Sequence, residues 1–371
     1  LYFNWGEKMI PVYKPFIPKA SINYCNEAIS SNWISSQGKY TTLAEEKLAD
    51  INNVKHCTLT NNGTSATHLT AKALAKKYPE IKKVYVPSAC YVAAYNCLLY
   101  DNVGWDIESV DLCDKTWNSN YNLFTPEENS ALMVVHNLGN IANVIKLKEK
   151  FNIPIIEDNC EGFFGEYEGN PSGSKSLCSS LSFFGNKNIT TGEGGAFLTN
   201  DSSLFHYINK IKCQGQTHKR YIHDELGYNY RMTNIQAAIL LGQLEEIDKI
   251  KENKKRVFDL YRKELEKIDG VTNQHIEKDT THSMWMIAAR FSPKYFSLNE
   301  LEEDLNTNRV ETRRMFYPHT YHNHLKIKGD VEVSTKINKE VLMLPSYPDL
   351  KNVEIKKICS IIANHQMNYK S

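Results

Sequence analysis

Lys187 stands in a setting in which an amine could do chemistry. It follows a short aromatic run at residues 182–186 and precedes a stretch rich in hydroxyls and glycine at residues 189–195. Glycines let the backbone turn tightly and approach a ligand, and an amine held on such a turn can form a Schiff base with a carbonyl group. A solvated loop lysine fits the same stretch, so other segments must distinguish the two interpretations.

A second chemical signal is the turn at residues 58–65, which leads into a helical pattern. Gly63, Thr64 and Ser65 stand at its start. A helix that begins in glycine and small hydroxyl residues presents free N–H groups and the positive end of its dipole, where phosphate binds. An ordinary N-cap made by Thr64 or Ser65 has the same sequence. The stretch therefore predicts either a phosphate site or a plain helix start.

Two adjacent acids, Glu157 and Asp158, end a largely apolar run at residues 153–156 that has the pattern of a strand. Successive side chains of a strand point to opposite faces, so at most one of the two acids can face a ligand. An acid in this place must be satisfied by backbone donors or must face a cationic group. We predict that Asp158 lies at the carboxyl end of the strand, at a crevice.

Strand patterns alternate with helical patterns over the first half of the chain. Expected strands at residues 84–87, 131–136, 153–158 and 195–199 are interspersed with expected helices at residues 88–99 and 145–151. This alternation predicts an α/β fold with a mostly parallel sheet, whose ligand crevice lies at the carboxyl ends of the strands. Tyr91, at a junction between strand and helix, could stack there on a flat ligand, although plain packing is the common role of such an aromatic.

The later part of the chain predicts a smaller second domain. A helical pattern begins near Ile235, keeps its apolar residues on one face up to Ile247, and continues to Lys267 as one long bridging helix. Short strands then mix with helices, as in an α+β lobe. We expect a large domain over residues 9–245, including an N-terminal lead-in, and a bridging helix with a small domain over residues 246–371.

Composition limits the classes of function. The 371 residues carry a formal net charge of +1, which gives no reason to expect nucleic acid or a membrane surface as a partner. The nine cysteines form no C-x-x-C pair and the twelve histidines have no metal-like spacing, so we expect reduced thiols, a cytoplasmic location and no metal. Residues 1–8 look like the remnant of a cleavable tag, with Met9 as the natural start.

A phosphate turn, a stacking aromatic, a strand-end acid and a turn lysine follow one another along this α/β chain, and pyridoxal phosphate needs this set. From Met9 onward the chain resembles the sugar-nucleotide aminotransferases of the DegT type, a fold-type I pyridoxal phosphate family. The motifs that carry the resemblance are residues 33–36, 63–64, 182–195, 219–223, 227–232 and 312–318. Residues 182–195 resemble in particular the branch that makes perosamine and viosamine.

The resemblance implies roles for individual residues. Lys187 would form the Schiff base, Asp158 would keep the pyridine nitrogen protonated, and Glu161 would lie beside the cofactor's hydroxyl face, a feature of the 4-amino branch. Cofactor contacts are further expected from Gly63, Thr64, Ser65, Tyr91, Ser182 and Asn229, the last of these from the neighbouring subunit of a homodimer with shared active sites. Substrate contacts are expected from Ser35, Lys219, Arg220, Tyr221, His223, Arg231, Arg313 and Tyr317.

The implied reaction transfers the amino group of L-glutamate to C4 of a nucleotide-linked 4-keto-6-deoxyhexose, giving a viosamine- or perosamine-type sugar. A 3-aminotransferase acting on a 3-keto sugar is the near alternative. The related 3-dehydratases resemble this family with histidine in the lysine position, and Lys187 argues against that activity. A non-enzymatic regulatory member would have no reason to retain Lys187, Asp158 and the phosphate turn together. Asn159 and Cys160 depart from the usual pair of alanines.

Overall fold

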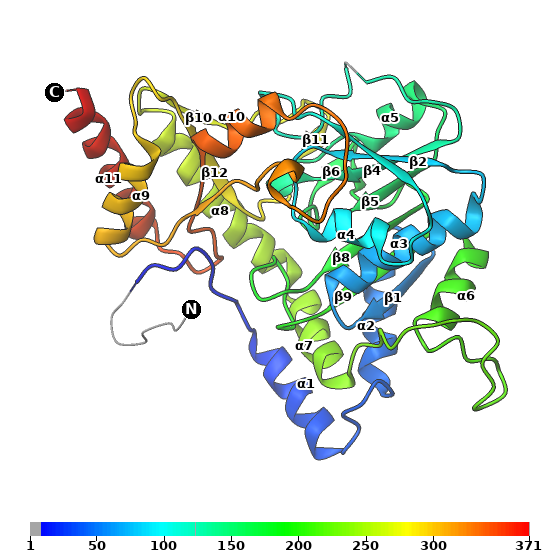
Figure 1. The fold of residues 1–371 in the computed structure, drawn as a ribbon. Coiled ribbons are helices and arrows are strands. Elements are labelled where there is room, and N and C mark those ends of the chain that lie inside the picture. The colour runs from blue at the N-terminus through cyan, green and yellow to red at the C-terminus, as the bar shows by residue number, and fades with distance from the viewer. Residues whose placement is uncertain (1–8, 123, 371) are drawn as a thin grey trace.

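The computed structural model describes residues 9–122 and 124–370, and a seven-stranded sheet lies at its centre (Figure 1). Its strands, in spatial order, are β1 (His56–Thr60), β9 (Gly195–Thr199), β8 (Cys178–Ser182), β5 (Ile155–Asp158), β4 (Ser130–Val135), β2 (Lys83–Pro87) and β3 (Asp106–Val110). All of these strands run in the same direction except β9, which runs antiparallel to β1 and β8. The mostly parallel α/β sheet expected from the sequence is confirmed.

Helices cover both faces of the sheet, and the period of two along each strand explains how. In β9, Phe197 packs with the cluster on α3, whereas Ala196 and Leu198 pack with the cluster on α2 and α7. The helices of the larger domain are α1 (Lys19–Ser30), α2 (Lys39–Ile51), α3 (Gly63–Lys77), α4 (Ala93–Leu99), α5 (Val144–Lys150), α6 (Ser202–Ile211) and α7 (Asn234–Glu245). Both faces are therefore buried, as in other parallel sheets.

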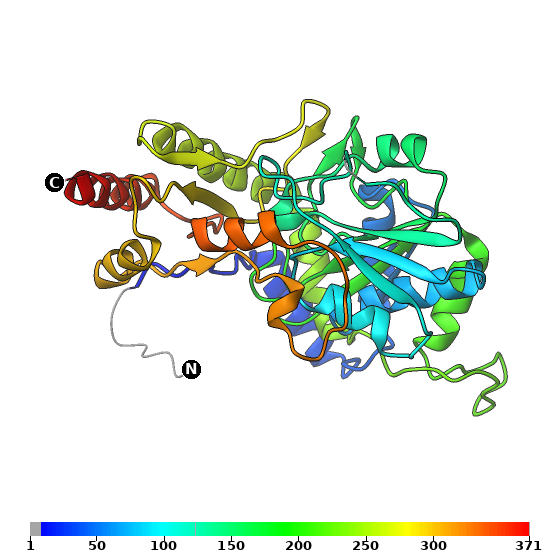
Figure 2. The same ribbon diagram turned by 45° about the horizontal axis from the view of Figure 1, so that its top comes forward.

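The smaller domain is built on a four-stranded antiparallel sheet beside the larger one (Figure 2). In spatial order its strands are β10 (Val271–Asn273), β12 (Ile287–Phe291), β14 (Val341–Leu344) and β13 (Arg313–Arg314), and its helices are α8 (Ile247–Leu265), α9 (Leu298–Thr307), α10 (Glu332–Glu340) and α11 (Asn352–Lys370). A small sheet of β7 (Asn170–Pro171), β6 (Glu166–Tyr167) and β11 (Thr280–Thr281) links the two parts of the chain. None of the described helices is long and apolar enough to cross a membrane.

The lead-in joins the smaller domain, although the sequence groups it with the larger one. Ile10 forms a parallel bridge with Val310 and packs in the hydrophobic cluster of α8, α9 and α11. The backbone N–H of Val12 donates to Glu311 Oε2 at 2.9 Å. Residues 1–8, which the sequence suggests are a tag remnant, lie outside the described residues.

The expected long bridging helix is two helices, α7 and α8, which meet at Glu246 with φ −103° and ψ 22°. The expectation of a single apolar face is also wrong for α7, because its buried positions lie most of the way round the helix. Gly242 explains part of this burial: a Cβ there would stand 2.2 Å from the backbone nitrogen of Ser21 in α1. The sequence did not reveal α1 and α2, and these are the helices that cover α7.

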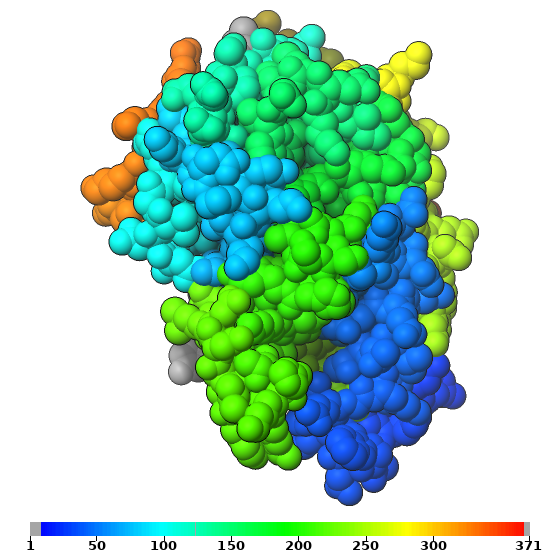
Figure 3. Space-filling view, turned by 90° about the vertical axis from the view of Figure 1, so that its right-hand side faces the viewer, coloured from blue at the N-terminus to red at the C-terminus, as the bar shows by residue number. Residues whose placement is uncertain are grey.

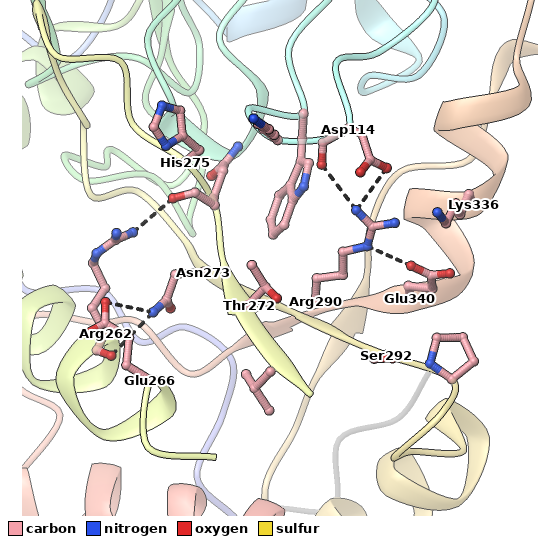
Figure 4. Close-up of a pocket in the computed structure, with 15 residues that line it drawn as sticks. Asp114, Arg262, Glu266, Thr272, Asn273, His275, Arg290, Ser292, Lys336 and Glu340 are labelled. Atoms are coloured by element: carbon pink, nitrogen blue, oxygen red, sulfur yellow. Dashed lines mark hydrogen bonds and ion pairs between the residues drawn. The ribbon is translucent and has the colours of Figure 1, made fainter. Parts of the chain in front are cut away.

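A groove of about 840 Å³ marks the seam between the domains (Figure 4). Arg290 from β12 crosses it, donating to Asp114 Oδ1 at 2.9 Å and to Glu340 Oε2 at 2.6 Å. Gln274 also spans the seam, donating to the carbonyl of Thr116 at 2.8 Å. These bonds hold the smaller domain against the larger one. The groove shares no lining residue with the cavity around Lys187.

Candidate active site

A cavity of about 580 Å³ opens at the carboxyl ends of β5 and β8. Three segments of the larger domain supply its floor: the start of α3 with Gly63, the end of β5 with Asp158, and the end of β8 with Ser182. Arg313 of β13 lines it from the smaller domain. The position agrees with the rule that ligands of open parallel sheets bind beyond the carboxyl ends of the strands.

Lys187 lies in the connection between β8 and β9. Its backbone N–H donates to the carbonyl of Phe184 at 2.9 Å, and its own carbonyl accepts the hydroxyl of Tyr13 at 2.7 Å. The Nζ atom lies over the ring of Trp285, 4.0 Å from its centroid, and the Nε1 atom of Trp285 donates to the carbonyl of Asn186 at 2.8 Å. The amine is therefore held at both its backbone and its tip, which favours the constrained-turn interpretation over the solvated one.

The start of α3 has the shape of an anion cradle. Asn62 is the N-cap, and its side chain accepts the N–H of Ser65 at 2.8 Å. The N–H groups of Gly63 and Thr64 precede the first intrahelical bond, and both residues line the cavity. A Cβ at Gly63 would stand 2.5 Å from Ser182 Cβ, so the backbone approaches this wall as closely as glycine allows. Ser65 is buried and does not line the cavity.

Glu157 and Asp158 face opposite sides of β5, as the strand period predicts. Glu157 is fully buried away from the cavity, where it accepts from His136 Nε2 at 2.9 Å and from the N–H of Gly173 at 3.0 Å. Asp158 lines the cavity, and its Oδ1 atom accepts the N–H of Cys160 at 3.1 Å. Its carboxylate can receive a proton-bearing ligand atom from the cavity.

Glu161 is a buried carboxyl group on the cavity wall. Its Oε2 atom accepts the N–H of Leu138 at 2.8 Å. Burial raises the pKa of Glu161 to about 7, against the opposing effects of the Lys187 ammonium and the Leu138 N–H. Near neutral pH this group can therefore either donate or accept a hydrogen bond, which suits a position beside an ionisable ligand oxygen.

The residues around the cavity fit pyridoxal phosphate. Lys187 supplies an amine, Asp158 an acid, and the glycine at the start of α3 a close approach for phosphate. Tyr91 is 58 % exposed on the wall and offers a ring for stacking. Asn186 Oδ1, a buried atom on the same wall, has no hydrogen-bond partner among the described residues. The cavity therefore already holds the amine, the acid, the phosphate turn and the aromatic ring that pyridoxal phosphate needs.

The expected substrate residues divide into two groups. Arg313 lines the cavity, and Tyr317 stands on the following segment with its ring 5.2 Å from that of Tyr321. The others do not line the cavity within this chain: Ser35, Lys219, Arg220, Tyr221, His223 and Arg231, together with the cofactor residue Asn229. They lie in segments 33–38 and 212–233, which share one face with α1 and α2 (Figure 3).

The loop at residues 33–38 is bonded to Asn234, the residue that directly follows segment 212–233. The N–H of Asn234 donates to the carbonyl of Ser35 and its Nδ2 atom donates to the carbonyl of Trp33, both at 2.6 Å. Asn229 touches the back of the phosphate turn, because Asn61 Nδ2 donates to its carbonyl at 3.4 Å. Segment 212–233 therefore reaches the edge of the site without entering the cavity of its own chain.

Sequence reasoning missed two groups around Lys187. Trp285 and Tyr13 contact it from residues 98 and 174 positions away in the chain, and neither stands in a chemical motif. Trp285 falls within the strand pattern at residues 284–291, where a tryptophan is ordinary core packing. Cys160, noted only as a departure, lies on the cavity wall with its thiol 3.6 Å from Thr67 Oγ1.

Comparisons with known proteins agree with this site. The GDP-perosamine synthase of Escherichia coli O157:H7 is 35% identical over 370 residues, which cover 96% of this chain and 98% of that protein. The enzyme of the same name from Vibrio cholerae is 34% identical, over 96% of this chain and 99% of that protein. The structure of Helicobacter pylori PseC superposes with a TM-score of 0.87 at 22% identity, over 97% of this chain and 100% of that chain. PseC is an aminotransferase involved in the biosynthesis of pseudoaminic acid.

The PseC likeness shows the fold, a fold-type I architecture that matches the one expected from the sequence. The family model described as DegT/DnrJ/EryC1/StrS aminotransferase matches residues 15–363. That match spans both domains, the phosphate turn, the strand-end acid and the turn lysine. The chain therefore belongs to the DegT/DnrJ/EryC1/StrS aminotransferase family of pyridoxal-phosphate-dependent enzymes.

Proposed function

We propose that this aminotransferase moves the amino group of L-glutamate onto C4 of a nucleotide-linked 4-keto-6-deoxyhexose, giving a 4-amino-4,6-dideoxyhexose. The observation that carries the proposal is the single cavity wall that combines Lys187, Asp158 and the glycine-lined start of α3. Three relatives at 33–35% identity are named GDP-perosamine synthases, so a GDP-linked sugar is the first substrate to test. The sugar product would then be of the perosamine type.

Pyridoxal phosphate, when bound, supplies an electron sink for the carbanion that remains when a carbon beside the nitrogen loses its proton. Lys187 would hold the resting cofactor, and its Nζ atom, once free, carries the proton between carbons. Asp158 would hold the proton on the pyridine nitrogen through its carboxylate. The N–H groups of Gly63 and Thr64, with the hydroxyl of Ser182, would hold the phosphate.

Glu161 and Arg313 extend the site toward the substrates. Glu161 can hold or release a proton near neutral pH, because burial raises its pKa to about 7. Arg313 presents a guanidinium fork that is 53% exposed on its side chain and pairs with Glu311 at 3.1 Å. A fork of this kind binds a carboxylate or a diphosphate in two-point geometry. Arg313 is thus suited to the anionic part of the nucleotide sugar or to the donor's carboxylate.

A homodimer with shared active sites is part of this proposal. Segment 212–233 and the loop at residues 33–38 expose large apolar side chains: Leu226 is 85%, Tyr221 76% and Trp33 60% exposed. Large exposed apolar side chains are typical of an interface, and a two-fold pair is the commonest assembly. In such a pair Asn229 and the basic residues beside it would complete the partner's cavity.

The reaction is tested by supplying glutamate with a 4-keto and, separately, a 3-keto nucleotide 6-deoxyhexose, and by locating the new nitrogen with NMR. Nitrogen at C4 is expected. Conversion of only the 3-keto sugar would replace the C4 assignment and leave the cofactor chemistry in place. That outcome has a precedent in a Pseudomonas aeruginosa relative, 29% identical over 88% of this chain, which is named an aminotransferase of a 3-oxo-D-glucuronate sugar.

The cofactor residue is tested with Lys187→Ala, which should lose both the visible absorbance of the bound cofactor and all turnover. Lys255→Ala is the matched control, because Lys255 is exposed on α8 and its ion pair within the described part of the chain is with Asp259, one turn away. Transamination by the Lys187 variant at the wild-type rate would end the proposed role.

Dimer formation is tested by sedimentation at assay concentration, where a fully active monomer would contradict shared sites. A cytoplasmic location fits the nine unpaired cysteines.

A further inference from the structure

Lys254 is an interior lysine that the proposed chemistry does not use. It lies on α8, the helix that follows α7 and joins the two domains (Figure 1), and it is 1% exposed. Among the described residues no carboxylate forms an ion pair with it, and burial lowers its pKa to about 7. A lysine buried without a counter-ion is costly to the fold unless its hydrogen-bond donors are used.

Main-chain carbonyls use those donors. The Nζ atom of Lys254 donates to the carbonyl of Trp285 at 2.9 Å and to the carbonyl of Ser346. It also lies 5.2 Å from the centroid of the Tyr13 ring. Lys254 therefore joins α8 to the segment before β12, to the segment after β14 and to the N-terminal lead-in.

Two of these three neighbours are the side chains that touch Lys187. Trp285 packs its ring against the Nζ atom of Lys187 and bonds the carbonyl of Asn186. Tyr13 donates its hydroxyl to the carbonyl of Lys187. The Trp285 ring fixes the tip of the Lys187 side chain, and the Tyr13 hydroxyl fixes the Lys187 backbone. Lys254 contacts both of these residues through its Nζ atom.

We propose that Lys254 is a positioning residue for Lys187, acting through the main chain of Trp285 and the ring of Tyr13. This inference rests on the proposed role of Lys187 in the reaction. Lys254 touches neither the cavity nor Lys187 itself, so its effect is indirect. One N–H of Lys254 Nζ bonds the carbonyl of Trp285, while the backbone N–H of Trp285 is bonded to Ser283 Oγ at 3.2 Å. The indole is thereby clamped on both sides of its own Cα.

The test compares Lys254→Met, which keeps the apolar stem and removes the donors, with Lys254→Arg, which keeps donors, and with Lys255→Met as the surface control. The first readout is hydrogen–deuterium exchange of the apoenzyme over residues 184–189, because the N–H of Lys187 is bonded to Phe184 there. We expect exchange about tenfold faster in Lys254→Met in this segment, with partial recovery in Lys254→Arg. Segments of α6, far from Lys254, should exchange as in the wild type.

The second readout is a double-mutant cycle with Trp285→Phe in the holoenzyme. If Lys254 acts through the indole, Lys254→Met lowers kcat by about tenfold in the wild-type background and by clearly less in the Trp285→Phe background. Uniformly faster exchange over the whole chain, unchanged exchange at residues 184–189, or strict additivity in the cycle would each overturn the proposal. Should Lys254→Met not fold, Lys254→Leu, which also removes the donors and keeps an apolar side chain, takes its place with the same outcomes.

The exchange experiment separates this inference from the proposed reaction. It uses the apoenzyme and reports the anchoring of the Lys187 segment whatever the substrate is. Faster exchange at residues 184–189 in an enzyme that fails to aminate any keto sugar would keep the positioning role and reject the reaction. Unchanged exchange at residues 184–189 in Lys254→Met, together with amination at C4 by the wild-type enzyme, would reject the positioning role and keep the reaction.

Discussion

His136 Nε2 donates a hydrogen bond to Glu157 Oε2 at 2.9 Å, one residue away from the acid that faces the cavity. The Nδ1 atom of the same ring accepts the N–H of Ala142 at 3.1 Å, which fixes the neutral tautomer with its proton on Nε2. Glu157 also accepts from the hydroxyl of Tyr167 at 3.2 Å. Among the described residues, each of the hydrogen bonds to Glu157 is accepted by its carboxylate, so an amide in its place would turn an N–H group toward groups that now donate.

Glu157→Gln and Asp158→Asn should therefore fail in different ways, although each replaces a carboxylate by its amide. The amide of Glu157→Gln points N–H groups at donors in the interior, so we expect a loss of about 3 kcal/mol in the free energy of unfolding. Asp158→Asn should keep its stability and lose kcat, because an amide cannot stabilise a protonated pyridine nitrogen as a carboxylate can. Urea unfolding and steady-state kinetics on both variants check this, and a normal kcat in Asp158→Asn would make Asp158 structural.

Glu161 should make stability depend on pH. Its folded pKa, about 7, lies above the ordinary value of 4.5 for a glutamate, so between these values the folded state binds a proton that the unfolded state has lost. Stability from this group is present in full below pH 4.5 and is lost as pH rises through 7. The wild-type apoenzyme should lose on the order of a few kcal/mol relative to Glu161→Gln over this range, since one pKa unit is worth about 1.4 kcal/mol.

Unfolding of both proteins at pH 5, 6, 7 and 8 measures this difference. Parallel curves for the wild type and Glu161→Gln would show that Glu161 is ionised throughout. In the holoenzyme, an inflection of kcat/KM near pH 7 that disappears in Glu161→Gln would place the same proton in the reaction.

Lys254 should impose the opposite trend. Burial lowers its folded pKa to about 7, below the ordinary value of 10.5 for a lysine, so between these values the unfolded state binds a proton that the folded state lacks. Stability therefore rises with pH from 7 toward 10.5. The wild type should gain on the order of a few kcal/mol relative to Lys254→Met over this range, measured by urea unfolding at pH 7, 8 and 9. Equal slopes for the two proteins would mean that Lys254 is charged in the folded state at all these pH values.

Gly63→Ala should weaken cofactor binding at least about tenfold, because its Cβ would meet Ser182 Cβ at 2.5 Å and push apart the walls of the phosphate cradle. Gly185→Ala is the matched control on the lysine segment: nothing lies within 4 Å of a Cβ built there. Titration of both apoenzymes with pyridoxal phosphate measures the effect. Equal affinities in the two variants would show that phosphate does not bind at the start of α3.

Local patterns in the sequence were enough to predict the α/β sheet and the residues on the cavity floor. Gly63 starts a helix, Asp158 ends a strand and Lys187 lies in the connection after a strand, and a parallel sheet brings such positions to one edge. The family resemblance added Glu161 and Arg313, which both line the cavity.

The rest depends on contacts between distant parts of the chain. The sequence pattern does not predict that the helix ends at Glu246, because apolar residues continue on both sides of it. The burial of α7 depends on its packing against α1 and α2. Trp285 and Tyr13 stand in ordinary core sequence, and only the packing of the domains brings them to Lys187. Lys254 looks like one charge among many on a solvated helix until its burial is known.

The lead-in gives the beginning of the chain an influence on chemistry that happens far along it. Ile10 and Val12 are bonded to the smaller domain, and Tyr13 is bonded to the carbonyl of Lys187 in the larger one. Shortening the protein to start at Lys14 would thus do more than trim an extended end. It would remove a tether between the two halves of the enzyme and loosen the catalytic amine, so a shortened version made for crystallisation or fusion would fold around its sheet and work poorly.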